Sequence, residues 1–336
     1  MTVKGSCILC GSSDPELLFK DRDRSGQAKG EFSVVKCRGC GLVYTLPDAD
    51  IGDIREFYPD ERCGIESAGP VAAVSSFESW LSKRYSRLLW RMLAGEDRNF
   101  LPQMIDFFEN ILSFPFYRYR NRCFPYRDKP GRLLDIGCGS GKLLSLEKRL
   151  GWEVYGVELE EKKASYAREV RDLNVITGDF KDIEYKSDFF DVISLRHVLE
   201  HLINPLVDLK KIREILKPGG LLVIRVPNQS RIEMAVFGKR WRAYDLPRHR
   251  FHFDRRTISK LVLKSGLKPL KISQALYINY MISGIGRILE ERGAPLWITG
   301  FFNIENKVLR GIFLPLGFLL KIIGQSSEIL VYAGKG

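Results

Sequence analysis

The stretch Arg132-Leu-Leu-Asp-Ile-Gly-Cys-Gly-Ser-Gly-Lys-Leu-Leu144 decides the fold. A short apolar run, typical of a buried parallel strand, is followed by glycines at every second position and then by a helix-forming segment. Glycine permits a positive φ and a close backbone approach, and N–H groups at a helix start favour polar or negative ligand groups. We therefore predict a strand, a tight loop and a helix that bind a nucleotide-like cofactor. The residues assigned to this loop are Asp135, Gly137, Gly139 and Gly141.

Two further predicted strands end in acidic residues. Trp152–Val157 is followed by Glu158, about twenty residues past the glycines, where a carboxylate can accept both hydroxyls of a ribose. Asn174–Asp179 ends in Asp179, which we expect to accept from an adenine amino group while Phe180 covers the ring. The glycine spacing differs from the G-x-G-x-x-G of dinucleotide enzymes, which points away from NAD.

In this order and spacing, the motifs resemble those of class I S-adenosylmethionine-dependent methyltransferases. Phe190-Asp191 at a strand start and Leu216-Lys-Pro-Gly-Gly220 before another strand complete the resemblance. It covers about residues 130–274 and returns at the last strand. It implies an α/β fold with a doubly wound, seven-stranded, mostly parallel sheet that is Rossmann-like and binds S-adenosylmethionine. A structural or NAD-binding Rossmann domain is the alternative.

Four cysteines at the N-terminus form two C-x-x-C pairs, Cys7/Cys10 and Cys37/Cys40. Four thiolates at this spacing suit a tetrahedral, structural Zn²⁺, so we predict a zinc ribbon over residues 1–47. Incidental pairs or a redox couple are the alternatives. A ribbon joined to a methyltransferase also resembles bacterial sugar and envelope-glycan methyltransferases. That likeness rests on the ribbon, on Gly41–Tyr44 with Pro47, and on Leu199–Leu202.

All four histidines fall in two segments, 196–202 and 242–253, which we expect at the carboxyl-end crevice where substrates bind. Methyl transfer aligns donor and acceptor and sometimes needs a base, and histidine has a suitable pKa. His201 is the first candidate for this base, with His197 and His249 next. Shaping the pocket, or a metal site of His197, His201 and Glu200, are alternatives. The second segment also carries arginines suited either to phosphate contacts or to a solvated loop, namely Arg240, Arg242, Arg248 and Arg250.

Composition indicates an anionic partner, because the 336-residue chain carries a net charge of +12 and a pI near 9.3. We expect residues 48–129 to form a helical lid or a phospholipid contact, 275–325 a hydrophobic helical insertion, and 326–336 the last strand. The uncharged run at 311–320 is too short to cross a bilayer, so an interfacial helix or a buried dimer or lid helix is predicted. No apolar signal region begins the chain, which indicates a cytoplasmic protein.

The sequence thus predicts a cytoplasmic enzyme, peripheral to the inner membrane, that methylates an anionic small molecule, glycan or lipid-linked acceptor. Envelope polysaccharide or secondary metabolism is the expected setting. The alternatives are a quinone or isoprenoid methyltransferase and a non-enzymatic zinc-ribbon protein that binds nucleic acid. Because acids nearly balance the bases of the ribbon segment, no nucleic-acid partner is expected. The acceptor atom and the oligomeric state stay open.

Overall fold

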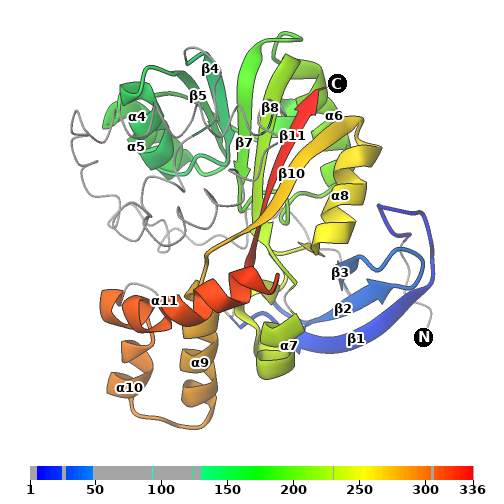
Figure 1. Ribbon diagram of the computed structural model, residues 1–336, viewed down its shortest axis with the longest axis vertical. Coiled ribbons are helices and arrows are strands. Elements are labelled where there is room, and N and C mark those ends of the chain that lie inside the picture. Colours follow the sequence, from blue (N-terminus) through cyan, green and yellow to red (C-terminus); the bar gives the residue numbers. More distant parts are fainter. Residues whose placement is uncertain are drawn as a thin grey trace. The chain divides into compact units, whose positions relative to one another are not determined.

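The computed structural model describes residues 6–24, 28–47, 93, 124, 130–229, 231–303 and 306–335 (Figure 1). The predicted lid at 48–129 therefore lies outside the described residues, apart from positions 93 and 124. The chain divides into two compact units. The first comprises Met1–Tyr58, Arg196–Lys210 and Ile224–Val331, and the second comprises Pro59–Leu195, Lys211–Val223 and Tyr332–Gly336.

A seven-stranded sheet carries the predicted methyltransferase core. Its strands, in the order β10-β11-β8-β7-β4-β5-β6, are β4 (Arg132–Ile136), β5 (Glu153–Glu158), β6 (Asn174–Thr177), β7 (Phe190–Arg196), β8 (Leu216–Pro227), β10 (Leu267–Ala275) and β11 (Glu328–Lys335). β4 runs parallel to β5 and β7, and β5 runs parallel to β6. Leu133 and Leu134 are fully buried, as expected for a parallel strand covered on both faces. The predicted sheet is confirmed.

Helices alternate with the strands, and α4 follows the glycine loop as predicted. They are α4 (Lys142–Arg149), α5 (Glu161–Glu169), α6 (Pro205–Ile215) and α8 (Arg255–Lys264), with a 3-10 turn, η3 (Phe180–Asp182), after β6. Asp254 caps α8 because its side chain accepts from Thr257 N, while the Thr257 hydroxyl accepts from Asp254 N. One detail differs, since the segment Leu216–Gly220, expected before a strand, already belongs to β8.

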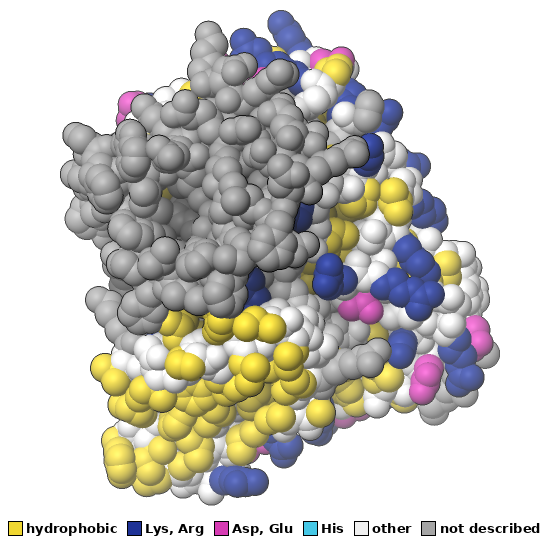
Figure 2. All heavy atoms as spheres, viewed as in Figure 1, with side chains coloured by type: hydrophobic (Ala, Val, Ile, Leu, Met, Phe, Trp, Pro, Cys, Tyr) yellow, Lys and Arg dark blue, Asp and Glu magenta, His cyan; other side chains and the backbone are white. Residues whose placement is uncertain are grey.

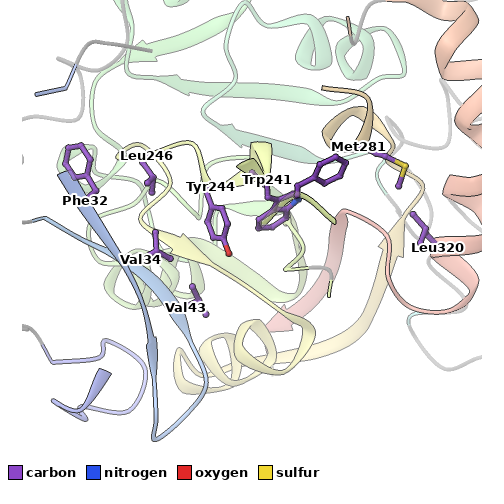
Figure 3. Packing of buried hydrophobic residues seen from close by; sticks show 10 residues of the cluster. Phe32, Val34, Val43, Trp241, Tyr244, Leu246, Met281 and Leu320 are labelled. Carbon is purple, nitrogen blue, oxygen red and sulfur yellow. The ribbon is translucent and has the colours of Figure 1, made fainter. Parts of the chain in front are cut away.

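A second sheet holds the N-terminal segment. β1 (Pro15–Arg22), β2 (Glu31–Cys37) and β3 (Val43–Pro47) form an antiparallel meander, and β9 (Phe251–His252) adds a fourth strand beside β3. The two-residue strand β9 is too short to show a strand pattern in the sequence, and it was not predicted. Next to this sheet lie α7 (Arg231–Phe237), η4 (Gly238–Arg240) and η5 (Arg242–Tyr244). Trp241, between the two 3-10 turns, and Tyr244 pack with Phe32, Val34 and Val43 in one buried cluster (Figure 3).

Three helices fill the predicted hydrophobic insertion between β10 and β11. They are α9 (Asn279–Glu291), α10 (Leu296–Phe301) and α11 (Lys307–Ile322). Asn306 caps α11 by accepting from the backbone N–H groups of Val308 and Leu309. Among the described residues, none of the helices combines the length and the apolar character that a membrane crossing requires.

Candidate functional site

The glycine loop after β4 has the backbone conformation that its sequence predicts. Gly137, Gly139 and Gly141 all have positive φ, at 71°, 56° and 74°. A β-carbon on Gly141 would lie 2.4 Å from Leu173 Cδ1, whereas a β-carbon on Gly139 would meet no atom of the described residues within 4 Å. Gly141 is therefore needed for packing, and the described residues leave space for a ligand beside Gly139.

Glu158 ends β5 and faces this loop. Its side chain is 7% exposed; Oε2 accepts from Gly139 N at 2.7 Å and Oε1 accepts from Glu160 N at 3.1 Å. Two backbone donors thus fix the carboxylate, and each oxygen keeps a second lone pair for a hydroxyl. Asp135 is buried in β4 just before the loop. This donor and acceptor set fits the ribose and amino acid parts of S-adenosylmethionine.

Asp179 and Phe180 follow β6 but differ in exposure. Asp179 caps η3 by accepting from Lys181 N at 3.1 Å, and its Oδ2 lies 3.2 Å from Lys181 Nζ. Phe180 is 4% exposed, and Lys211 Nζ lies 5.1 Å from its ring centroid. Contact with an adenine stays a prediction for both residues, although the burial of Phe180 leaves little of its ring to cover a base.

His197 is held between two buried glutamates. Its Nε2 lies 2.8 Å from Glu328 Oε1 and its Nδ1 lies 3.4 Å from Glu200 Oε1. His197 and His201 do not lie on a common helix, because α6 begins only at Pro205. His197 instead has φ 55° and donates its N–H to the carbonyl of Arg225.

The two glutamates determine the charge of this histidine. Burial lowers the pKa of His197, but Glu200 and Glu328 outweigh that effect and raise it to about 9. Burial likewise opposes ionisation of Glu328, whereas Arg225, whose Nη1 lies 3.6 Å away, and His197 lower its pKa. His197 is therefore protonated at neutral pH; its Nε2–H donates to Glu328, and it forms an ion pair with Glu200. Sequence reasoning missed Glu328, although an acid at the start of an apolar final strand is a detectable signal.

His201 and His249 form a second pair of rings, with centroids 4.6 Å apart. Burial and the neighbouring His249 lower the pKa of His201 to about 4, so this ring is neutral at pH 7. Its Nδ1 lies 3.0 Å from the carbonyl of Arg248, which places the proton of the neutral ring on Nδ1. His249 Nδ1 lies 2.7 Å from Ala243 O. His201, unlike His197, is therefore unprotonated at neutral pH, as a base must be.

A cation could also occupy this cluster. Ligand atoms of Glu200, His201 and His249 all lie within 4.8 Å of one another. The predicted metal set included His197 instead of His249, but His197 points its nitrogens at the two glutamates. His252, the fourth histidine, is 3% exposed with Nε2 3.1 Å from Thr45 Oγ1, and it packs in the N-terminal sheet.

The four N-terminal cysteines converge as their spacing predicts. Sγ atoms of Cys7 and Cys40 are 3.5 Å apart, those of Cys10 and Cys37 are 3.4 Å apart, and all four lie within 4.8 Å of one another. Zinc–sulfur bonds of about 2.3 Å in a tetrahedron separate sulfurs by about 3.8 Å, so the cluster is compatible with Zn²⁺. The loop behind each pair closes through a backbone bond, from Gly11 N to Cys7 O and from Gly41 N to Cys37 O.

Comparisons with known proteins identify the family of this chain. A methyltransferase-domain family model matches residues 110–272. The ubiquinone biosynthesis O-methyltransferase of Cereibacter sphaeroides is 31% identical over 180 residues, which cover 50% of this chain and 72% of that protein. The protein of the same name from Maricaulis maris is 34% identical over 155 residues, covering 43% and 56%. A solved S-adenosylmethionine-dependent methyltransferase from Mesorhizobium loti is 16% identical, with coverage of 66% and 97% and a TM-score of 0.42.

Proposed function

The chain belongs to the class I methyltransferases that use S-adenosylmethionine, and from this premise we propose that it methylates a ring hydroxyl of a quinone precursor or a related phenol. The observation that carries the acceptor class is the 31% identity to a ubiquinone biosynthesis O-methyltransferase across half of this chain. It favours the quinone alternative of the sequence prediction over a glycan acceptor.

We assign the cofactor to the open side of the glycine loop. When bound, S-adenosylmethionine supplies an electrophilic methyl group on a sulfonium. Glu158, fixed by the N–H groups of Gly139 and Glu160, would accept the ribose hydroxyls. Asp135 would orient the amino acid part from β4, and Asp179 would accept from the adenine amino group.

His201 is our candidate for the proton acceptor. Its ring is neutral at pH 7, which a proton acceptor requires, and its Nδ1–H bond to the Arg248 carbonyl fixes the orientation of the ring. His197, protonated by its two glutamates, cannot accept a proton at neutral pH and is better suited to hold Glu200 in place. His249 would orient the ring of His201 across their 4.6 Å contact.

The cysteine cluster has a separate, structural role in this proposal. Cys7, Cys10, Cys37 and Cys40 would hold one Zn²⁺ with a closed coordination shell, because four thiolates leave no position for a substrate. The ion would contribute folding free energy to the small N-terminal sheet rather than reaction chemistry.

Methyl transfer from radiolabelled S-adenosylmethionine tests the proposal directly. The acceptors are phenols, catechols and hydroquinones with and without an isoprenoid tail, beside nucleotide-sugars and lipid-linked glycans. We expect labelling of a phenolic oxygen, a loss of kcat of about 10²–10⁴-fold in His201→Gln, and unchanged affinity of that variant for S-adenosylhomocysteine. Labelling of a glycan alone, or full activity of His201→Gln, would overturn the acceptor class or the base assignment respectively.

A further inference from the structure

Large apolar side chains lie exposed along α10 and α11. On α11 they recur at helical spacing and form one stripe. Leu296 and Trp297 of α10 are 88% and 77% exposed. We call the whole set the apolar face, and its members are Leu296, Trp297, Phe301, Val308, Ile312, Leu316, Leu319, Ile322 and Ile323. Figure 2 shows hydrophobic side chains gathered over these C-terminal helices, a concentration that usually marks a binding surface.

Basic residues accompany this face in the sequence. Between positions 292 and 323 the chain has four basic residues, Arg292, Lys307, Arg310 and Lys321, and a single acidic residue, Glu305. Apolar side chains flanked by cations match the chemistry of an anionic lipid layer, where the rings and aliphatic groups enter the interface and the cations meet phosphates. A second copy of the same face is a poorer partner, since a two-fold interface would bring the same cations together.

A cavity of about 460 Å³ lies where α9 and α10 meet, and it shares α10 with the apolar face. Polar and aromatic side chains line it, and its charged residues are Arg242, Arg287 and Glu290, so positive charges outnumber the single negative one. Thr299 and Gly300 of α10 line the cavity, whereas Leu296 and Trp297 of the same helix belong to the apolar face. An amphiphile could therefore place a charged group in the cavity and its chains along the helix.

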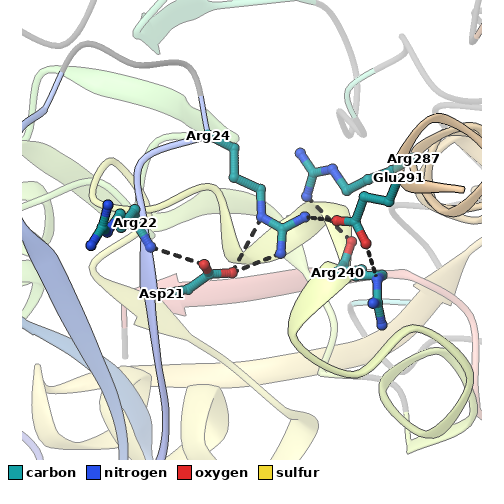
Figure 4. A network of polar contacts seen from close by, with 6 residues as sticks. All are labelled: Asp21, Arg22, Arg24, Arg240, Arg287 and Glu291. Carbon is teal, nitrogen blue, oxygen red and sulfur yellow. Dashed lines mark hydrogen bonds and ion pairs between the residues drawn. The ribbon is translucent and has the colours of Figure 1, made fainter. Parts of the chain in front are cut away.

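The cations of this region exceed the carboxylates that pair with them (Figure 4). Glu291 pairs with both Arg24 and Arg240, and Asp21 also pairs with Arg24. Arg287 donates to the carbonyl of Arg240 at 3.3 Å. Within the described part of the chain, the ion pairs include neither Arg287 nor Arg242.

The neighbouring positive charges affect the pKa of Arg287. Burial, together with the charges of Arg242 and Arg24, lowers the pKa of its guanidinium to about 10. A phosphate bound between Arg242 and Arg287 would reverse this effect, because guanidinium groups bind phosphate oxygens with paired, charge-assisted hydrogen bonds.

We propose that the apolar face of α10 and α11 docks on an anionic phospholipid layer, with a lipid phosphate received by Arg242 and Arg287 in the adjoining cavity. The proposal does not depend on the acceptor of the methyl group. Lipid binding can be measured without S-adenosylmethionine, so its failure is distinguishable from failure of the proposed activity.

Vesicle flotation of the full chain tests the docking surface. Wild type should float with phosphatidylcholine vesicles that contain phosphatidylglycerol and not with phosphatidylcholine alone. Ile312→Asp, which replaces a side chain 64% exposed on the apolar face, should weaken partitioning at least tenfold, and Arg287→Gln should weaken it about fivefold. Leu263→Asp and Arg256→Gln on α8 are matched controls, with Leu263 58% exposed, and should float like wild type.

Trp297 gives an independent readout. Brominated phospholipids should quench part of the tryptophan fluorescence of wild type and much less in Trp297→Phe. Absence of flotation, equal losses in the control variants, or a dimer that Ile312→Asp converts to monomers without any vesicle binding would each overturn the proposal. The proposal would also be overturned if Arg287 bound inorganic phosphate but the protein did not bind vesicles.

Discussion

Replacing Gly141 with alanine should destabilise the protein more than replacing Gly139, although both glycines belong to one loop and have positive φ. The shared cost is the left-handed backbone, about 1–2 kcal/mol for an alanine. Only Gly141 is crowded, because its new β-carbon would lie 2.4 Å from Leu173 Cδ1 and 3.1 Å from Ala167 Cβ. Overpacking of this kind adds about 1–3 kcal/mol. The free energy of unfolding should therefore fall by about 2–5 kcal/mol for Gly141→Ala and by about 1–2 kcal/mol for Gly139→Ala.

Cofactor affinity should rank the same two variants in the opposite order. An alanine at 139 projects into the open space beside the loop, where a ligand would approach, and it also disturbs the N–H that holds Glu158. We expect Gly139→Ala to lose at least tenfold in affinity for S-adenosylhomocysteine, which corresponds to about 1.4 kcal/mol. Gly141→Ala, if measured well below its unfolding transition, should lose less.

Urea unfolding, monitored by circular dichroism, gives the free energy of unfolding of each variant. Calorimetric titration with S-adenosylhomocysteine gives its affinity for the ligand. The crossed ranking is the decisive result, because a general loss of folding would lower both quantities in the same variant. Equal stability of the two variants would refute the clash at Gly141. Wild-type affinity of Gly139→Ala would refute the assignment of the ligand to the open side of the loop.

Three further outcomes follow from the contacts described above. The pKa of His197 is raised from 6.5 to about 9, so the stability that its protonated form gives the fold is complete below pH 6.5 and is lost as the pH rises through 9. Urea titrations should therefore show a decline of about 1–3 kcal/mol in the free energy of unfolding over this range, and Glu328→Gln should not show it. Chelation or Cys37→Ser should remove one zinc per chain and abolish amide-exchange protection of the N-terminal sheet, whereas protection that survives metal loss would contradict a structural ion. Trp241→Phe removes the Nε1–H that donates to the fully buried Glu233 at 2.8 Å and should cost about 1–3 kcal/mol in urea unfolding; an unchanged midpoint would mean that this bond contributes nothing.

The core sheet was predictable because local signals and burial agree there. Apolar runs such as Leu133–Ile136, punctuated by glycines that the backbone needs at positive φ, specify strand and loop together. The clustering of the four cysteines was equally predictable, because two short C-x-x-C loops bring four thiols together once β1 and β2 pair.

Long-range partners were not predictable by the same means. No local sequence pattern predicts that Glu328 in the last strand contacts His197, which follows β7. None predicts that Glu200 and His201 lie beside His249, which comes from a later insertion. His197 likewise has a positive φ, and its backbone N–H donates to the carbonyl of Arg225 in a distant part of the sequence. Such contacts depend on how distant segments pack, which periodicity does not encode.

The pairing of β3 with β9 has a consequence for synthesis on the ribosome. Tyr44 pairs with Phe251, and the Thr45 N–H donates to the carbonyl of Arg250. At about 5–20 residues per second, the 200 or so residues that separate these partners take about 10–40 seconds to be translated. During that interval β3 is an open edge that can pair with another nascent chain. Early capture of a metal ion by the cysteines would hold the hairpin in register until its last strand emerges.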